Sequence, residues 1–265
     1  MEQIFGPTGE PNYRSQEILG IRFFDGNVDE AIEIMLQHGG TVVVPAAPAL
    51  VKLRYENEDY RCALTQADLA IADSGLMVLL WKLLHGRKIV RISGLKYLQH
   101  LNTRLPVEKS GDVFWIVPTD SAREKTASWL SANRFAFADA DLYVAPHYGP
   151  VIEDRQLLEK IDQQRPSHIV IGIGNGPQEK LGRYLRDHLT YRPAIHCIGG
   201  ALGFLTGDQV AIPDWADRFY LGWLFRLVAQ PGVFIPRLTR ALELPWLIWK
   251  YGEELPPLKH RWRDV

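Results

Sequence analysis

A short apolar run in this chain ends at three closely spaced glycines. Residues Ile169–Ile171 are followed by Gly172, Gly174 and Gly176, and a helix-like segment then spans residues 178–189. This order predicts a buried strand, a glycine turn and a helix start. Free backbone N–H groups at such a start, with the helix dipole behind them, favour an anionic group such as a phosphate. The spacing matches neither the dinucleotide-binding nor the Walker pattern, so a tight connection without a ligand stays open.

Short apolar runs alternate with helix-like segments along most of the chain. Strands are predicted at residues 18–24, 41–44, 69–72, 113–117, 140–145, 169–171 and 196–198. Helices are predicted at residues 28–38, 48–54, 60–67, 76–84, 121–131 and 178–189. This alternation is typical of an α/β fold, here a Rossmann-like, mostly parallel sheet with helices on both faces. Ligands bind such sheets at the carboxyl ends of strands, where Asp73, Gly172–Glu179 and Gly199–Gly207 are expected.

Length, charge and cysteine content limit the class of protein. A chain of 265 residues is long enough for one large α/β domain with an appendage. Its net charge of −1 gives no general attraction to nucleic acid. The two cysteines, Cys62 and Cys197, are typical of reduced core thiols, so we expect a cytoplasmic setting. The N-terminal residues do not match a signal peptide, and no apolar run approaches the roughly 20 residues that span a bilayer.

The last part of the chain has a different composition. We therefore expect an α/β domain at residues 1–210 and a helical C-terminal appendage at residues 211–265. Between Trp215 and Lys250 the appendage has five basic residues against two acidic ones, and it holds five of the eight tryptophans. Tryptophan and arginine among apolar residues fit a helix at a membrane interface. They fit a helical pair packed on the core equally well.

Four blocks of residues form a more specific pattern when they are taken together. The blocks are Ile18-Leu-Gly-Ile with Asp29-Glu30-Ala31-Ile32; Tyr60-Arg61 with Ala67-Asp68-Leu69, Asp73 and Gly86; Gly172-Ile-Gly-Asn-Gly-Pro-Gln-Glu-Lys180; and Gly199-Gly200-Ala201 with Pro213, Trp215 and Leu221-Gly-Trp-Leu-Phe-Arg226. In this order and spacing they resemble the WecG/TagA/CpsF glycosyltransferases, sequence family 26 of that enzyme class. The resemblance covers about residues 18–240, which is most of the chain.

The resemblance implies an inverting transferase that moves a sugar from a UDP donor onto a polyprenyl-diphosphate-linked sugar. It implies action at the cytoplasmic face of the membrane, during assembly of a surface polysaccharide. Some family members self-associate, so a homo-oligomer stays open, but the sequence identifies no interface. An inverting transfer needs a carboxylate to take the proton of the acceptor hydroxyl. It also needs positive charge or N–H donors on the leaving diphosphate.

The resemblance assigns roles to individual residues. Asp73 lies where the family has its catalytic carboxylate, and we expect it to be the general base; an N-cap of the helix that follows is the alternative. Arg91 matches an arginine near the phosphates of the sugar donor, with a solvated position as the alternative. Gln178 and Glu179 are expected to hold the donor's sugar or diphosphate, with a role on the helix surface as the alternative. The loop glycines Gly172, Gly174 and Gly200 complete the expected donor site.

The appendage and the metal content are the remaining expectations. Arg226 and Arg237 of the appendage are expected to reach the diphosphate when this segment closes over the site. No cluster of histidine, cysteine and acidic residues has metal-ligand spacing, and Asp139-Ala-Asp141 precedes its strand rather than following it. We therefore expect a reaction without metal or other cofactor.

The sequence departs from the family pattern at the expected site. Pro45 and Ala47 replace a Thr-x-Asn pair that points at the sugar, and Asn175-Gly176-Pro177 replaces Ala-Pro-Lys. The departures leave the sugar open among N-acetylmannosamine, glucose and a uronic acid. They also leave open a catalytically silent relative that acts as a membrane-bound assembly factor. A dehydrogenase is disfavoured, because no Gly-x-Gly-x-x-Gly lies in a first βαβ unit.

Overall fold

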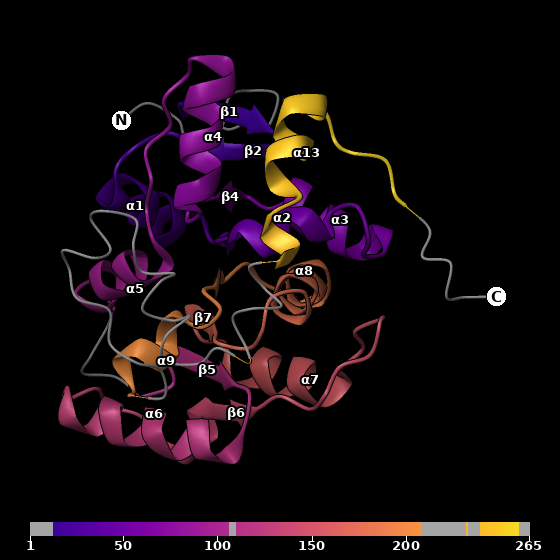
Figure 1. Cartoon of the computed structure of the whole chain (residues 1–265). Coiled ribbons are helices and arrows are strands. Elements are labelled where there is room, and N and C mark those ends of the chain that lie inside the picture. The colour runs from indigo at the N-terminus through magenta and orange to yellow at the C-terminus, as the bar shows by residue number, and fades with distance from the viewer. Residues whose placement is uncertain (1–12, 106–109, 208–231, 233–238, 260–265) are drawn as a thin grey trace.

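The fold is built on one mostly parallel β-sheet. The computed structural model describes residues 13–105, 110–207, 232 and 239–259. In this part of the chain eight strands form one sheet in the order β1-β2-β4-β3-β8-β7-β5-β6 (Figure 1). The strands are β1 (Ser15–Ile18), β2 (Ile21–Phe24), β3 (Gly40–Val43), β4 (Leu69–Ala70), β5 (Val113–Val117), β6 (Leu142–Val144), β7 (His168–Ile171) and β8 (Ala194–Cys197). The predicted α/β fold class is confirmed.

The register of the sheet brings the carboxyl ends of the central strands together. Only the β1–β2 pair is antiparallel among the described strands. Cys197 at the end of β8 is level with Val43 of β3 on one side and with Ile171 of β7 on the other. The loops that follow β3, β8 and β7 therefore leave the sheet side by side, which is where parallel sheets bind ligands.

Helices cover both faces of the sheet (Figure 1). The helices are α1 (Val28–His38), α2 (Ala47–Lys52), α3 (Glu58–Thr65), α4 (Gly75–His85), α5 (Gly94–Asn102), α6 (Asp120–Ala132), α7 (Arg155–Gln164), α8 (Pro177–His188), α9 (Ala201–Leu205) and α13 (Leu244–Tyr251), with a 3-10 turn η1 (Asp139–Asp141). Buried residues of α2, α3, α4, α7, α8 and α13 form one core cluster, and those of α1, α5, α6 and α9 form another. Strand side chains alternate between them: Ile116 joins the first, and Trp115 and Val117 join the second.

The first predicted strand, residues 18–24, was wrong as a single element. β1 and β2 form a hairpin whose two turn residues, Leu19 and Gly20, have φ angles of 53° and 74°. Two successive positive φ values make the kind of turn that matches the twist of a hairpin. The leucine keeps this strained conformation because its N–H donates to the carbonyl of Gly252 at 2.8 Å and its side chain is buried.

Three helices, α5, α7 and α9, were not predicted. The signal for α5 is present, since Ser93 caps the helix and Tyr97, Leu98 and Leu101 give it one buried face. Helix α5 bears on the site, because the N–H of its first residue, Gly94, donates to the expected general base, Asp73.

The last described helix, α13, is part of the main core. Leu244, Leu247 and Ile248 are fully buried in the first core cluster, and α13 packs against α4. The expected boundary near residue 210 stays a prediction, because residues 208–231 and 233–238 lie outside the described part of the chain. Within the described residues, none of the helices has both the length and the apolarity needed to cross a membrane.

Candidate active site

Asp73 follows β4 and lies just before α4, but it does not cap that helix. Ser74 is the N-cap, and its Oγ accepts the N–H of Met77 at 3.2 Å. The alternative for Asp73, an N-cap role, is therefore wrong. Asp73 is half-buried, and its carboxylate does not bond to the N-terminus of α4.

The Asp73 side chain is held by the start of α5. Its Oδ1 accepts the N–H of Gly94, the first residue of that helix, at 3.0 Å. This hydrogen bond orients the Asp73 side chain toward the start of α5. Arg91 is also brought to Asp73, because its Nε donates to the Asp73 carbonyl at 2.9 Å. Asp73 and Arg91 thus lie in contact, and their expected roles as general base and donor-binding residue stay predictions.

The glycine turn after β7 is a tightly bonded helix start. Gly176 has a φ of 104° and precedes α8, and its N–H donates to Oε2 of Glu179 at 2.5 Å. Oε1 of Glu179 accepts from Nε2 of Gln178 at 2.9 Å. Both side chains are buried, so the helix-surface alternative for them is wrong. Glu179 acts within the turn as the partner of Gly176.

Burial shapes the chemistry of this turn. Removal from water raises the pKa of the Glu179 carboxyl, and hydrogen bonds from Gln178 and from the Gly176 N–H oppose that rise. Oε1 of Gln178 is also buried and has no hydrogen-bond partner among the described residues. The turn therefore holds one acceptor atom that its own contacts leave unsatisfied.

A lysine that sequence reasoning missed supplies positive charge to the turn. Lys52, the last residue of α2, donates from Nζ to the carbonyl of Asn175 at 3.0 Å. The family pattern has a lysine inside the turn, which this chain lacks. Lys52 comes from a point 123 residues away in the sequence, so no local motif signals it.

The remaining glycines differ in the space around them. A Cβ at Gly174 would meet no described atom within 4 Å, whereas one at Gly172 would lie 3.0 Å from Cδ2 of Leu202. Gly200 is exposed at the start of α9. Of the three, Gly174 and Gly200 leave their backbone open to solvent.

The turn and the Asp73 cluster are joined through the end of β8. A Cβ at Gly199 would lie 3.3 Å from Nε2 of Gln178. A Cβ at Gly94 would lie 3.6 Å from the carbonyl oxygen of Ile198. The start of α5, which holds Asp73, therefore abuts the same loop that covers the buried Gln178. The residues predicted from separate motifs therefore lie at the carboxyl ends of neighbouring parallel strands.

Comparison with known proteins identifies the family. A sequence model described as the glycosyl transferase WecG/TagA/CpsF family matches residues 16–260. The chain belongs to this family. It is 24% identical over 209 residues to the N-acetylglucosaminyldiphosphoundecaprenol N-acetyl-beta-D-mannosaminyltransferase of Bacillus spizizenii, with 79% of this chain and 77% of the relative covered. It is 22% identical over 238 residues to the enzyme of the same name from Bacillus subtilis, with 88% and 89% covered.

Some residues expected in this WecG/TagA/CpsF glycosyltransferase are not placed by the structure. Arg226 and Arg237 lie outside the described residues, so their predicted contact with the diphosphate stays a prediction. Within the described residues, no three histidine, cysteine or acidic side chains are grouped so that they could hold a metal ion.

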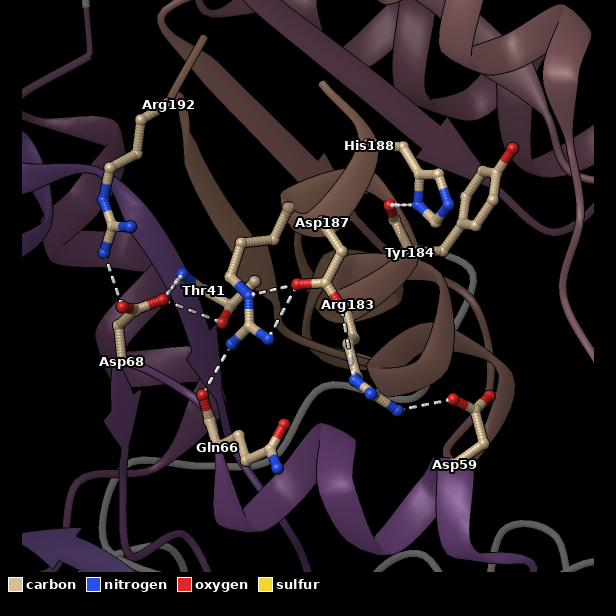
Figure 2. Close-up of polar contacts among 10 residues, drawn as sticks. Thr41, Asp59, Gln66, Asp68, Arg183, Tyr184, Asp187, His188 and Arg192 are labelled. Atoms are coloured by element: carbon tan, nitrogen blue, oxygen red, sulfur yellow. Dashed lines mark hydrogen bonds and ion pairs between the residues drawn. The ribbon is translucent and has the colours of Figure 1, made fainter. Parts of the chain in front are cut away.

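Structural ion pairs lie at the amino ends of the parallel strands (Figure 2). Asp68, from a block that resembles the family, accepts from the backbone and hydroxyl of Thr41 and pairs with Arg192 at 2.5 Å. Two hollows of about 340 and 300 Å³ open at these amino ends, both lined by Tyr191, Arg192 and Pro193. Arg192 is already paired with Asp68 and with the carbonyl of His38. The residues expected to form the donor site lie at the carboxyl ends of the strands, away from these hollows.

Proposed function

We propose that this glycosyltransferase moves a sugar from a UDP donor to a polyprenyl-diphosphate-linked sugar, with inversion at the anomeric carbon. The names of the two Bacillus relatives support this acceptor class. The observation that carries the proposal is the position of the Asp73 carboxylate at the N-terminus of α5, beside the loops that follow β8 and β7. The product would enter synthesis of a bacterial exopolysaccharide or wall polymer, with the enzyme peripheral at the inner face of the cell membrane.

Asp73 acts as the general base in this proposal. Its carboxylate takes the proton of the acceptor hydroxyl while that oxygen attacks the anomeric carbon of the sugar donor. The bond between the anomeric carbon and the UDP oxygen breaks, and UDP leaves from the face of that carbon opposite the attacking oxygen, which inverts the configuration of the carbon. The hydrogen bond from the Gly94 N–H orients the carboxylate without using its second oxygen.

The leaving UDP carries negative charge that must be stabilised. Arg91 lies against the backbone of Asp73, and Lys52 brings a second cation to the glycine turn. Both donate hydrogen bonds to carbonyl groups, so both are oriented before a ligand arrives. Preorganised positive charge of this kind stabilises a leaving group more than mobile charge does. Gly174, with its open backbone, is where the sugar donor can approach most closely.

The identity of the sugar depends on the loop after β3. Pro45 and Ala47 occupy the two positions where the family pattern has polar side chains, and neither can donate a side-chain hydrogen bond. We propose a hexose donor, for which glucose, N-acetylmannosamine and a uronic acid are the sugars to test.

A panel of UDP-sugars tests the proposal. Each is added to the purified chain together with N-acetylglucosaminyl-diphospho-undecaprenol, and both thermal unfolding and transfer are measured. A donor that binds only the folded state raises the unfolding temperature. We expect one UDP-sugar to do so and to be consumed with inversion. Stabilisation without turnover of any donor would instead support the catalytically silent assembly factor, for which the loss of polar groups at Pro45 and Ala47 is the specific argument.

A further inference from the structure

Helix α4 is apolar on the side that faces solvent as well as on the side that faces the core. Met77 and Trp81 are buried in the first core cluster. Leu76, Leu79 and Leu83 are 40%, 50% and 79% exposed. Their spacing of three and four residues places them on one stripe of the helix. The outer face of a surface helix is normally polar, so this stripe needs an explanation.

Helix α13 adds an exposed tryptophan near the C-terminal end of α4. The two helices pack against each other at one end of the molecule (Figure 1). Nε2 of His85 lies 3.4 Å from the carbonyl oxygen of Ile248, which joins the ends of the helices. Trp249 follows directly and is 68% exposed. We call the exposed side chains of Leu76, Leu79, Leu83 and Trp249 the α4–α13 face.

Positive charge surrounds the α4–α13 face. Lys82, Lys88 and Lys250 are exposed at the ends of the two helices. Arg87 is there as well and pairs with Glu253, whose neighbour Glu254 is also acidic and exposed. Amphipathic surfaces with tryptophan and lysine beside leucine are typical of proteins that lie on a bilayer. Each lysine near an anionic lipid surface strengthens the attraction to it.

We propose that the α4–α13 face binds the surface of an anionic lipid bilayer. A second copy of the chain fits the observations less well. In a two-fold contact each chain presents the same surface, so a face on which Lys82, Lys88, Lys250 and Arg87 outnumber Glu253 and Glu254 would meet another net-basic face. An anionic bilayer matches both the apolar stripe and the charge around it. The inference goes beyond the expected role of the appendage, because the leucine stripe is on α4 in the α/β part of the chain and only α13 belongs to the appendage.

The leucine stripe of α4 begins close to Asp73, the proposed general base. Leu76 lies three residues after Asp73, and α4 begins directly after its cap, Ser74. A bilayer bound along the stripe would therefore lie close to the edge of the sheet that holds Asp73. A sugar linked to a membrane lipid would reach the base without leaving the membrane surface. This last step rests on the proposed function, whereas lipid binding itself does not.

The experiment is flotation of the full chain with vesicles of phosphatidylcholine and phosphatidylglycerol, without substrates. The double variant Leu79→Gln with Leu83→Gln is compared with Val151→Gln, a matched change at a residue that is 74% exposed in the loop before α7. Because both leucines lose apolar area that would be buried in lipid, we expect the double variant to bind at least about tenfold more weakly. Val151→Gln should bind as the parent chain does.

A second variant separates the contribution of charge. Lys82→Gln with Lys88→Gln should weaken binding to these vesicles at least about fivefold. It should leave binding to pure phosphatidylcholine unchanged. Equal vesicle binding by the leucine variant and the parent chain would overturn the proposal. So would a dimer of the parent chain in sedimentation that the leucine substitutions dissociate while vesicle binding persists. If vesicle binding needs the leucines but no UDP-sugar is transferred, the proposed function fails and this inference stands.

Discussion

Asp73 accepts the backbone N–H of Gly94 through Oδ1 at 3.0 Å, so the expected base is held by α5 rather than by the helix that it precedes. The cap of that following helix is Ser74. Asp73 and Ser74 therefore have separable roles: Asp73 is the proposed base of the reaction, and Ser74 stabilises the start of α4. Substitution of each in turn distinguishes chemistry from stability.

Asp73→Asn should reduce the rate of transfer by at least about 100-fold, because the amide cannot take a proton from the acceptor. UDP-sugar binding should be nearly unchanged, since the shape of the side chain is kept. Steady-state turnover and calorimetric binding measure the two effects. Ser74→Ala is the control: it should cost about 1 kcal/mol of unfolding free energy and leave turnover close to that of the parent. Transfer by the Asp73 variant at the parental rate would contradict the assignment.

Lys52→Met should weaken UDP-sugar binding about tenfold, because it removes the cation that contacts the glycine turn. Lys160→Met on α7 is the matched control, since it also removes one lysine charge but Lys160 lies over the ring of Phe114 instead. Isothermal titration with the donor that the panel identifies measures both. Equal donor affinities in the two variants would show that Lys52 stabilises the glycine turn without contributing to binding of the UDP-sugar.

The glycines of the turn should respond differently to alanine. Gly176→Ala should destabilise the fold by more than about 1 kcal/mol, because its φ of 104° is strained for any residue with a Cβ. Gly174→Ala should be almost neutral for stability, since its Cβ would enter open space among the described atoms. It should weaken donor binding if the sugar donor approaches there. Denaturant unfolding combined with titration of the donor separates the two effects. A Gly174 variant that binds normally would remove this residue from the donor site.

The sequence predicted the sheet, the order of its strands along the chain and most helices, because burial on both faces gives parallel strands a strong apolar signal. Val113–Val117 and the Asn27-capped helix at 28–38 are confirmed at every boundary. The hairpin at Leu19 was missed because its positive φ depends on a bond to Gly252 at the far end of the chain.

In the candidate site, too, features with local sequence motifs could be predicted and features that depend on tertiary packing could not. Asp73, Arg91 and the glycine turn carry local motifs, so they could be predicted from the sequence, and the structure brings them to one edge. The contact of Lys52 with Asn175 could not, since it depends on how α2 packs beside the turn. The burial of Gln178 and Glu179 could not be predicted either, because polar residues at a helix start normally face solvent.

Transfer should persist in excess EDTA. In the proposed mechanism Arg91, Lys52 and backbone N–H groups supply the positive charge that a metal ion supplies in other glycosyltransferases. Turnover measured before and after chelation, and again after addition of manganese, tests this. Activity that is abolished by EDTA and restored by manganese would contradict the prediction and would require metal ligands not recognised in the sequence.

Acid should destabilise the fold through two buried histidines in the centre of the sheet. Nδ1 of His196 lies 2.9 Å from the hydroxyl of Tyr97 on α5, and its Nε2 lies 3.3 Å from Nδ1 of His168. Burial lowers the pKa of both imidazoles below the ordinary 6.5; the neighbouring His168 lowers that of His196 further, and Asp112 partly opposes the shift at His168.

The direction in which pH changes the free energy of unfolding follows from how many protons each state binds. Above pH 6.5 both histidines are neutral in the folded and unfolded chain, so their contribution to stability is complete. Below that value the unfolded chain binds protons that the folded chain excludes, and each histidine costs up to about 1.4 kcal/mol per pH unit. His168→Gln should reduce the loss of unfolding free energy between about pH 7.5 and 5.5, whereas the exposed His188→Gln should leave it unchanged. Identical pH profiles for the parent chain and the His168 variant would show that other groups cause the acid sensitivity.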